Sequence, residues 1–243
     1  MRYIQKNEQP QALINWKAQR NAAGQPLDFQ QLGRVQVDGN DVDVKKAIKE
    51  QRLKDQGYLC AYTMMRINLD SSHVEHLKPQ TLSRINDRVK HFIEETVDYG
   101  NMVLCYPKRE DKGGVGFGAP HRGDAKLAVT PREERCETRI KYKLDGTVSS
   151  EDSDVSKMID EVLNLNHATL VDRRKDSYKR KGLGLRSEKP ISEKEAIRLA
   201  EAALQIDSND KLMPFCVGIS HAAQEHVKLI QKRRHKRAMA RKQ

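Results

Sequence analysis

The chain has 243 residues, of which 37% are hydrophobic, enough for one sizeable core or a small catalytic domain with a helical extension. It contains neither a run of the ~20 apolar residues that a membrane span needs nor an apolar signal-peptide core after Met1, so we expect a cytoplasmic protein without a membrane partner. A formal net charge of +11 favours a polyanionic partner, nucleic acid first, although lysine-rich helices that serve only solubility would give the same charge.

The N-terminal third is expected to hold one clear helix. Residues 1–40 are polar and carry the turn signals Gly24-Gln-Pro26 and Asp38-Gly39, which predicts an irregular lead-in with one short helix. Residues 44–56 are rich in Lys, Glu, Ala and Leu and stop at Gly57. This pattern is typical of a helix that has a glycine after its C-cap.

Residues 80–100 have the apolar spacing of a helix with one buried stripe. The stripe consists of Leu82, Ile85, Val89, Phe92, Ile93 and Val97. Residues 101–106 are a short apolar run that ends at Pro107, and the glycine-rich residues 113–118 follow. We therefore expect an inserted helix, then a strand, then a flexible loop.

Residues 140–148 alternate around the turn dipeptide Asp145-Gly146, which predicts a β-hairpin. The patterns after this hairpin are helical. The fold class is therefore expected to be α+β, with residues 1–150 as one domain and residues 151–243 as a mainly helical C-terminal extension with a basic tail.

Three apolar stripes mark the helices of the C-terminal region. They lie in residues 155–163, 196–204 and 219–230, and the second begins with a capping box formed by Ser192 and Glu195. The stripes of the last two helices either pack on the rest of the chain or dock a second protein. The last helix runs into a basic tail, which contains Lys232, Arg233, Arg234, Lys236, Arg237, Arg241 and Lys242.

Glu75 and His76 place a carboxylate beside an imidazole. Hydrolysis of a phosphodiester needs a base that deprotonates water and a divalent cation that neutralises charge on the phosphate. Glu75 suits the cation and His76 suits the base. The alternation of a strand would turn the two side chains to opposite faces, whereas at a strand end or turn both reach one phosphate.

His121, with Pro120 before it and Arg122 after it, supplies a second imidazole for such a site. Two protein ligands, with water and phosphate in the other positions, suit Mg²⁺ or Mn²⁺. Arg122 is then a candidate for contact with phosphate. Three roles are open for His73: a metal ligand, a hydrogen-bond donor to a metal ligand, or an ordinary strand residue. For any single histidine a surface or core role is the simpler explanation, and the combination carries the argument.

Three segments resemble the HNH, or ββα-metal, endonuclease motif. They are His-Val-Glu-His-Leu-Lys-Pro at 73–79, Tyr-Gly-Asn-Met-Val-Leu at 99–104 and His-Arg-Gly-Asp at 121–124. The opening residues 1–6, the Leu-Cys-Ala-Tyr turn at 59–62 and Tyr-Lys-Leu-Asp-Gly at 142–146 further resemble PtuB, the HNH family of Septu and Septu-like retron anti-phage systems. The resemblance covers most of residues 1–180 and is most specific at 73–79.

This resemblance implies a small ββα-metal core and a role for each matching residue. Glu75 takes the position of the first metal ligand, and His76 that of the general base. Asn101 matches the asparagine that orients the loop and the base histidine by hydrogen bonding. His121 resembles the last metal-binding histidine, although another alignment places Ala119 there.

The cysteines depart from the pattern of these nucleases. Many relatives carry two Cys pairs that bind a structural zinc, whereas here Thr63 stands where the second cysteine of the first pair is expected. The four cysteines, Cys60, Cys105, Cys136 and Cys216, are widely spaced and form no CxxC motif. We therefore expect reduced thiols, no disulfide framework and no structural Cys₄ zinc.

Two functions follow. The first is a metal-dependent endonuclease acting on DNA or RNA with a PtuA-type ATPase in antiviral defence, and in retron-associated systems also with a reverse transcriptase and its RNA and DNA. The second is a catalytically inactive, basic nucleic-acid-binding or scaffold subunit of such a complex. In both, nucleic acid is expected to contact Lys78, Arg122, Lys232, Arg233 and Arg234. The chain has no Gly-x-x-x-x-Gly-Lys-Ser/Thr motif, so ATP dependence would come from the partner.

Overall fold

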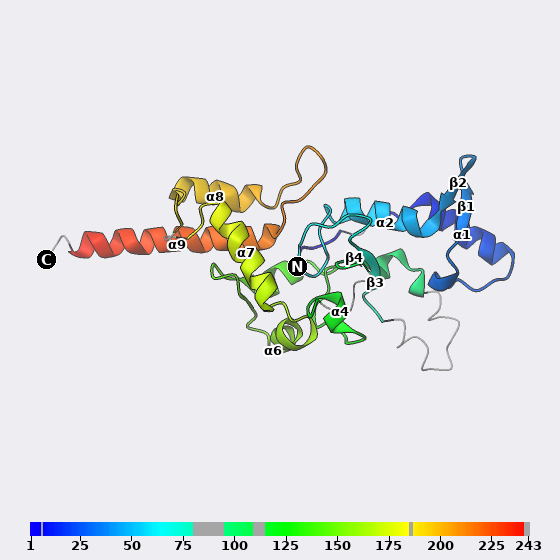
Figure 1. Ribbon diagram of the computed structural model, residues 1–243, viewed down its shortest axis with the longest axis horizontal. Helices are drawn as coiled ribbons and strands as arrows, with labels where there is room; N and C mark the ends of the chain where they lie inside the picture. Colours follow the sequence, from blue (N-terminus) through cyan, green and yellow to red (C-terminus); the bar gives the residue numbers. More distant parts are fainter. Residues whose placement is uncertain (6, 80–94, 109–114, 185–186, 241–243) are drawn as a thin grey trace.

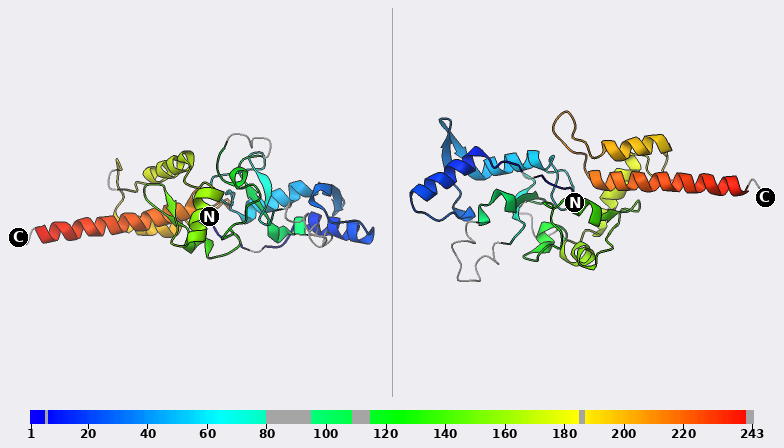
Figure 2. Two further views of the ribbon diagram at one scale, coloured as in Figure 1. Left: turned by 90° about the horizontal axis from the view of Figure 1, so that it is seen from below. Right: turned by 180° about the vertical axis from the view of Figure 1, so that it is seen from behind.

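The computed structural model describes residues 1–5, 7–79, 95–108, 115–184 and 187–240. Over these ranges the chain has a mixed α+β fold, as expected. Figure 1 and Figure 2 show an elongated molecule. Helix α1 (Gln11–Ala22) and the hairpin of β1 (Arg34–Val37) and β2 (Asn40–Asp43) lie at one end, and the long helix α9 (Cys216–Ala240) lies at the other. No helix in the described ranges combines the length and the apolar character that a membrane crossing requires.

Helices make up most of the regular structure in the described ranges, and the strands form short hairpins. The α-helices are Gln11–Ala22 (α1), Val44–Asp55 (α2), Ala119–Arg122 (α4), Cys136–Arg139 (α5), Ser153–Lys157 (α6), Ala168–Arg180 (α7), Glu193–Ala202 (α8) and Cys216–Ala240 (α9). Shorter helical turns are Phe29–Gln31 (η1), Tyr99–Asn101 (η3) and the π-helical Met158–Val162 (η5). The antiparallel strand pairs are Arg34–Val37 (β1) with Asn40–Asp43 (β2), His73–His76 (β3) with Met102–Cys105 (β4), and Lys141–Tyr142 (β5) with Val148–Ser149 (β6).

The N-terminal lead-in is more ordered than its sequence predicted. It contains the twelve-residue α1 and also the β1–β2 hairpin. Asp38 and Gly39 link these strands, and both have positive φ, which suits a two-residue hairpin turn. The hairpin was missed because its strands are largely polar, and only Val35 of the two strands is buried.

The predicted helix after residue 43 is confirmed as α2. The Asp43 side chain accepts the Lys46 N–H and caps its first turn. Gly57 follows the C-cap with φ of +54°, and a Cβ there would lie 2.6 Å from Leu212 Cγ. Glycine is therefore required both by the backbone conformation and by the packing of Leu212.

The β3–β4 hairpin lies between two hydrophobic clusters. The main core includes Val103 and Leu104 of β4 and combines residues from before and after position 150. A second, N-terminal cluster gathers residues of α1, β1 and α2 around Met102. Val74 of β3 packs against both clusters. The hairpin therefore joins the two cores.

The C-terminal helices pack mainly on one another. Ala200 of α8 and Ile219, Ala222 and Ala223 of α9 form a third cluster with Tyr178 of α7. Of the two alternatives for the last two stripes, these residues follow packing within the chain, because the stripes cover each other. The first turn of α9 reaches the main core instead, through Cys216 and Val217.

Other sequence predictions have mixed outcomes. The hairpin around Asp145-Gly146 is confirmed as β5–β6, and the capping box of Ser192 and Glu195 is confirmed at α8. The strand expected in 101–106 is confirmed as β4. Helix α7 has no counterpart among the predicted stripes. Most of the helix predicted for residues 80–100 falls on residues 80–94, which lie outside the described residues.

We predict that His221 makes stability depend on pH. Its Nδ1 accepts the Tyr142 N–H at 3.2 Å, and burial, followed by the charges of Lys141 and the N-terminus, lowers the pKa of His221 to about 4. The neutral ring is favoured by folding, so its contribution is complete above the ordinary pKa of 6.5 and is lost as pH falls toward 4. Unfolding free energy should drop by about 2 kcal/mol over this range, allowing for partial exposure.

His221→Asn keeps a hydrogen-bond acceptor but cannot titrate, so urea denaturation of this variant should show a smaller loss between pH 6.5 and 4. His235→Asn is the control, because His235 is exposed on α9. Equal pH profiles for wild type and His221→Asn would contradict the assignment.

Candidate functional site

Strand β3 divides the candidate residues between its two faces. Glu75 pairs with Arg122 and lies beside His73, whereas the His76 ring lies against Phe29, with ring centroids 4.8 Å apart. The strand ends at His76, so the alternation includes both Glu75 and His76. Glu75 and His76 are therefore neighbours in sequence that project into different surroundings.

Arg122 of α4 is the centre of the hydrogen-bond network on the Glu75 face. Its side chain is fully buried, and it forms an ion pair with Glu75 Oε1 at 2.8 Å. The same guanidinium donates to the carbonyl oxygens of His76, Leu77 and Ala125 and to the Tyr62 hydroxyl. Arg122 thus ties α4 to the end of β3. In the structure the N–H groups of Arg122 donate to other groups of the protein. Contact of Arg122 with phosphate therefore stays a prediction.

The second oxygen of the Glu75 carboxylate faces His73. Glu75 Oε2 lies 3.5 Å from His73 Nε2, and the Glu75 side chain keeps 16% of its exposure. His73 Nδ1 is hydrogen-bonded to the Pro107 carbonyl oxygen. The carboxylate is therefore fixed at one oxygen by Arg122 and is partly open at the other.

His76 is held in one orientation by its surroundings. Its Nε2 lies 2.8 Å from the Thr96 carbonyl oxygen, and the residue is 7% exposed. A carbonyl oxygen only accepts, so a neutral ring in this contact carries its proton on Nε2. Nδ1 is then the basic nitrogen of His76.

Asn101 fixes the loop after β3. Its Oδ1 accepts the Lys78 N–H at 2.7 Å, and its Nδ2 donates to the carbonyl oxygens of Lys78 and Glu95. The Asn101 carbonyl oxygen also accepts the Leu77 N–H at 2.9 Å. Asn101 therefore holds the two residues that follow His76.

His121 and Lys78 have other contacts. His121 is exposed, and its Nδ1 lies 3.1 Å from the Val162 carbonyl oxygen. In the described ranges no hydrogen bond or ion pair joins His121 to Glu75, so its role as a metal ligand stays a prediction. Lys78 forms an ion pair with Glu95 at 2.6 Å, with which a phosphate would have to compete.

Two of the four cysteines lie next to this site. Cys105 of β4 is paired in register with His73, and its thiol is hydrogen-bonded to Cys60. Burial opposes ionisation of Cys60, but hydrogen bonds from Cys105, Thr63 and the Tyr106 N–H lower its pKa to about 6. Burial, followed by the interaction with Cys60, raises the pKa of Cys105. Cys60 is therefore the thiol of this pair that ionises more readily.

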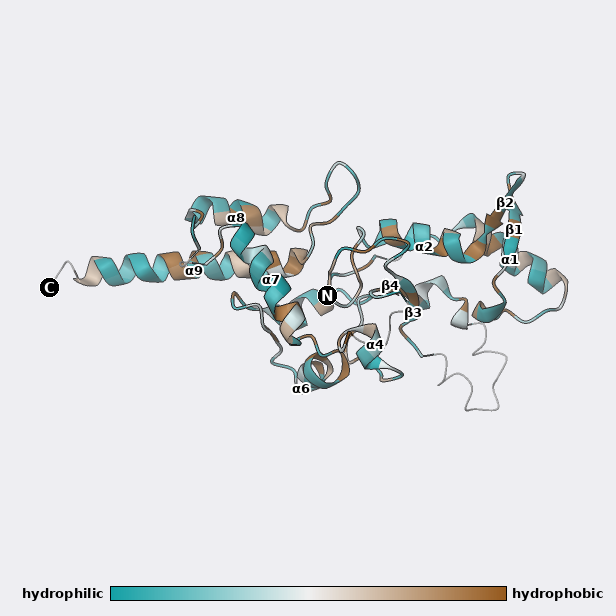
Figure 3. Ribbon diagram, in the orientation of Figure 1, coloured by the Kyte–Doolittle hydropathy of each residue, from teal (hydrophilic) through white to brown (hydrophobic). Residues whose placement is uncertain are grey.

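Basic side chains gather on the C-terminal helices. Residues 231–240 of α9 form an exposed helical segment that is hydrophilic over most of its length (Figure 3). Arg234 forms an ion pair with Glu193 at 2.8 Å, whereas Lys232 and Arg233 have no such partner in the described part of the chain. A projecting helix with cations on its surface suits contact with a phosphate backbone.

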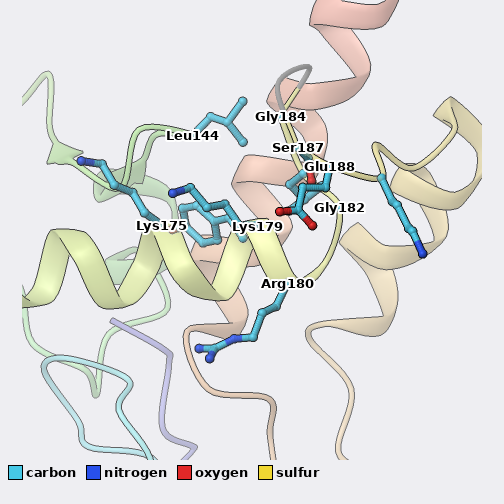
Figure 4. A pocket seen from close by; sticks show the side chains of 11 residues that line it. Leu144, Lys175, Lys179, Arg180, Gly182, Gly184, Ser187 and Glu188 are labelled. Carbon is cyan, nitrogen blue, oxygen red and sulfur yellow. The ribbon is translucent and has the colours of Figure 1, made fainter.

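A pocket of about 710 Å³ lies between α7 and the segment that follows it (Figure 4). Lys175 and Lys179 extend along one side of α7, whereas Arg180 points away on the other side. Glu188 also lines the pocket and offsets part of this charge. None of the residues that contact Glu75 lines it, so this pocket belongs to the basic surface of the C-terminal region.

No protein-family model and no curated protein sequence matches the chain. Among the residues that the structure describes, no group of three or more His, Cys, Asp or Glu side chains is placed to hold a metal ion. The candidate site therefore consists of pairs of side chains and their hydrogen bonds.

The sequence did not reveal how the site is supported. Arg122 was assigned to phosphate because it follows His121, and nothing in its local pattern indicates burial. The sequence gives no signal for Thr96, which contributes a backbone carbonyl, and it marks Tyr62 only as part of the Leu-Cys-Ala-Tyr turn, without indicating its contact with Arg122. These contacts join residues 20 to 60 positions apart.

We predict that Arg122→Met destabilises the fold by about 3–5 kcal/mol, because it leaves the Glu75 carboxylate and three carbonyl oxygens without their partner. Arg139→Met is the matched control. Arg139 makes an exposed ion pair with Asp152, and its loss should cost less than about 1 kcal/mol. Urea denaturation followed by circular dichroism measures both, and similar losses in the two variants would refute the supporting role of Arg122.

Proposed function

We propose that the chain is a metal-dependent endonuclease of the HNH type, in which β3, β4 and α4 form the ββα core. The observation that carries this proposal is the joint arrangement of Glu75 and the loop after His76. Arg122 from α4 holds the Glu75 carboxylate, and Asn101 from η3 holds the loop. A carboxylate, an imidazole and an asparagine on one hairpin are the groups that this chemistry uses.

Glu75 is proposed as a ligand of the divalent cation. Arg122 engages only Oε1, and the partly exposed carboxylate retains Oε2 for a hard cation such as Mg²⁺ or Mn²⁺. When bound, the cation stabilises negative charge on the phosphate and on the leaving oxygen. His121 is the other ligand that the sequence proposes.

His76 is proposed as the general base. The contact of Nε2 with the Thr96 carbonyl holds the ring in one orientation. In a neutral ring with its proton on Nε2, Nδ1 is the nitrogen with the basic lone pair, and it is proposed to accept a proton from water. Asn101 positions this histidine indirectly, because it holds Leu77 and Lys78 by their backbone groups. Its part in the reaction is thus to keep the end of β3 in place.

We further propose that nucleic acid binds through the basic segment of α9. Lys232 and Lys236 are one helical turn apart and share a face, and Arg233 lies beside them. Arg234 joins this surface while its ion pair with Glu193 fixes the helix against α8. Contacts to phosphate would be independent of sequence, which suits DNA and RNA alike.

A second candidate function is a nucleic-acid-binding subunit without catalysis. Two observations favour it: His76 is only 7% exposed, and it lies on the opposite face of β3 from Glu75. A phosphate reached by both residues has to sit at the end of the hairpin. In this alternative the hairpin is a structural element, and the basic helix alone carries the function.

A partner ATPase of the PtuA type remains part of the proposal. The chain lacks a phosphate-binding Gly-x-x-x-x-Gly-Lys-Ser/Thr motif, so nucleotide hydrolysis has to come from another protein. Because the stripes of α8 and α9 cover each other, this partner would contact a different surface. In a retron-associated system a reverse transcriptase with its RNA and DNA would join the complex.

We predict that His76→Gln lowers the cleavage rate by at least about 100-fold, because glutamine can donate to the Thr96 carbonyl but has no basic nitrogen. The assay uses plasmid DNA and a structured RNA with Mg²⁺ or Mn²⁺, with the partner ATPase present. Lys157→Gln is the control, since Lys157 is exposed on α6 and makes only an exposed ion pair. Unchanged cleavage by His76→Gln, or full cleavage in EDTA, would remove the catalytic proposal and leave the binding subunit.

We predict that replacing three cations of α9 by glutamine weakens binding to duplex DNA and flattens its salt dependence. Each lost phosphate contact should reduce the slope of log K against log salt by about 0.9. A control triple variant with the same change in net charge, placed elsewhere, should keep the wild-type slope. The tested residues are Lys232, Arg233 and Lys236, and the control residues are Lys46, Lys54 and Lys157. Equal slopes for the two variants would exclude α9 as the binding surface.

A further inference from the structure

His73 has a buried nitrogen atom without a hydrogen-bond partner. In the described part of the chain, its Nε2 is buried and makes no hydrogen bond. The residue is 8% exposed, so solvent compensates little of this loss. Its other nitrogen, Nδ1, faces the Pro107 carbonyl oxygen. Because a carbonyl only accepts, Nδ1 of a neutral ring carries the proton and Nε2 presents a lone pair.

This lone pair faces the carboxylate of Glu75. Nε2 lies 3.5 Å from Glu75 Oε2, the oxygen that Arg122 does not engage. With a neutral ring these two acceptors have no proton between them, and a bound cation joins them, as a proton on Nε2 would. Two atoms bound to one cation at ~2.0–2.2 Å lie ~2.8–3.6 Å apart, for angles between octahedral and tetrahedral. The observed separation falls within this range.

We propose that His73 and Glu75 form a two-residue divalent metal site, with His73 Nε2 as the nitrogen ligand in place of His121. The proposal rests on the metal dependence of the proposed function and names the second ligand of that site. An imidazole that donates its other N–H to a backbone carbonyl has the usual arrangement of a metal-binding histidine. His121 also contacts a backbone carbonyl through Nδ1, but it is exposed, and among the described residues no hydrogen bond or ion pair joins it to Glu75.

The donor set also selects the metal. An imidazole nitrogen beside a carboxylate oxygen favours Mn²⁺ and heavier transition ions over Mg²⁺, which prefers oxygen ligands. Arg122 already balances the charge of Glu75, so the site holds its cation loosely until a phosphate adds negative charge. The site therefore takes Mn²⁺ together with a phosphate oxygen of the substrate.

The proposal is tested by electron spin-echo envelope modulation of Mn²⁺ bound to the full-length protein, which detects a coordinated ¹⁴N. The wild type should show imidazole modulation. The variant His73→Asn retains a donor for the Pro107 carbonyl but has no atom at the Nε2 position, and it should lose the modulation and bind Mn²⁺ at least about 10-fold more weakly. Glu75→Gln should also weaken binding, and His121→Ala is the matched control that should retain the modulation.

Modulation that persists in His73→Asn and disappears in His121→Ala would overturn the proposal, as would a wild-type spectrum without nitrogen modulation. Circular dichroism establishes that each variant is folded. Cleavage is measured separately on the same samples. Wild-type protein that shows His73-dependent modulation but does not cut nucleic acid supports the metal site and refutes the nuclease, whereas cleavage without His73-dependent modulation refutes the metal site alone.

Discussion

The buried guanidinium of Arg122 is the interaction on which the candidate site depends. It reaches from the short helix α4 to the end of β3 and satisfies three carbonyl oxygens, a tyrosine hydroxyl and the Glu75 carboxylate. A charge in this position is tolerated only because each donor has an acceptor and the carboxylate balances it. The planar fork of arginine permits this, and a lysine ammonium at the same place would leave acceptors unpaired.

The position of β3 between two hydrophobic clusters then separates the chemistry of its side chains. Glu75 and His73 face the network of Arg122, whereas His76 enters the N-terminal cluster beside Phe29. Burial fixes each side chain in one orientation, which is useful for a catalytic group and equally useful for a structural one. A nitrogen ligand of a bound metal would therefore concern the face of β3 that carries His73 and Glu75. Replacement of His76 by a residue that is not basic concerns the opposite face.

Charge is distributed unevenly over the molecule. The hairpin carries a balanced ion pair, and the cations without partners among the described residues include Lys232 and Arg233 on the projecting part of α9. A long helix needs support at its base, which the small residues of α8 and α9 supply by close packing with Tyr178. The proposed binding of a polyanion on α9 and the proposed reaction at the β3–β4 hairpin would therefore use different parts of the molecule.

Local patterns in the sequence determined the helix after Asp43, the capping box at Ser192 and the turn at Asp145-Gly146, because each depends on neighbouring residues alone. The sequence also singled out Glu75, His76 and Asn101 by residue type and spacing. Only the tertiary structure decided which way these side chains point, that Arg122 is buried, and that the stripes of α8 and α9 cover each other. Those features come from contacts between distant segments, such as the 47 positions between Glu75 and Arg122, and no local pattern records them.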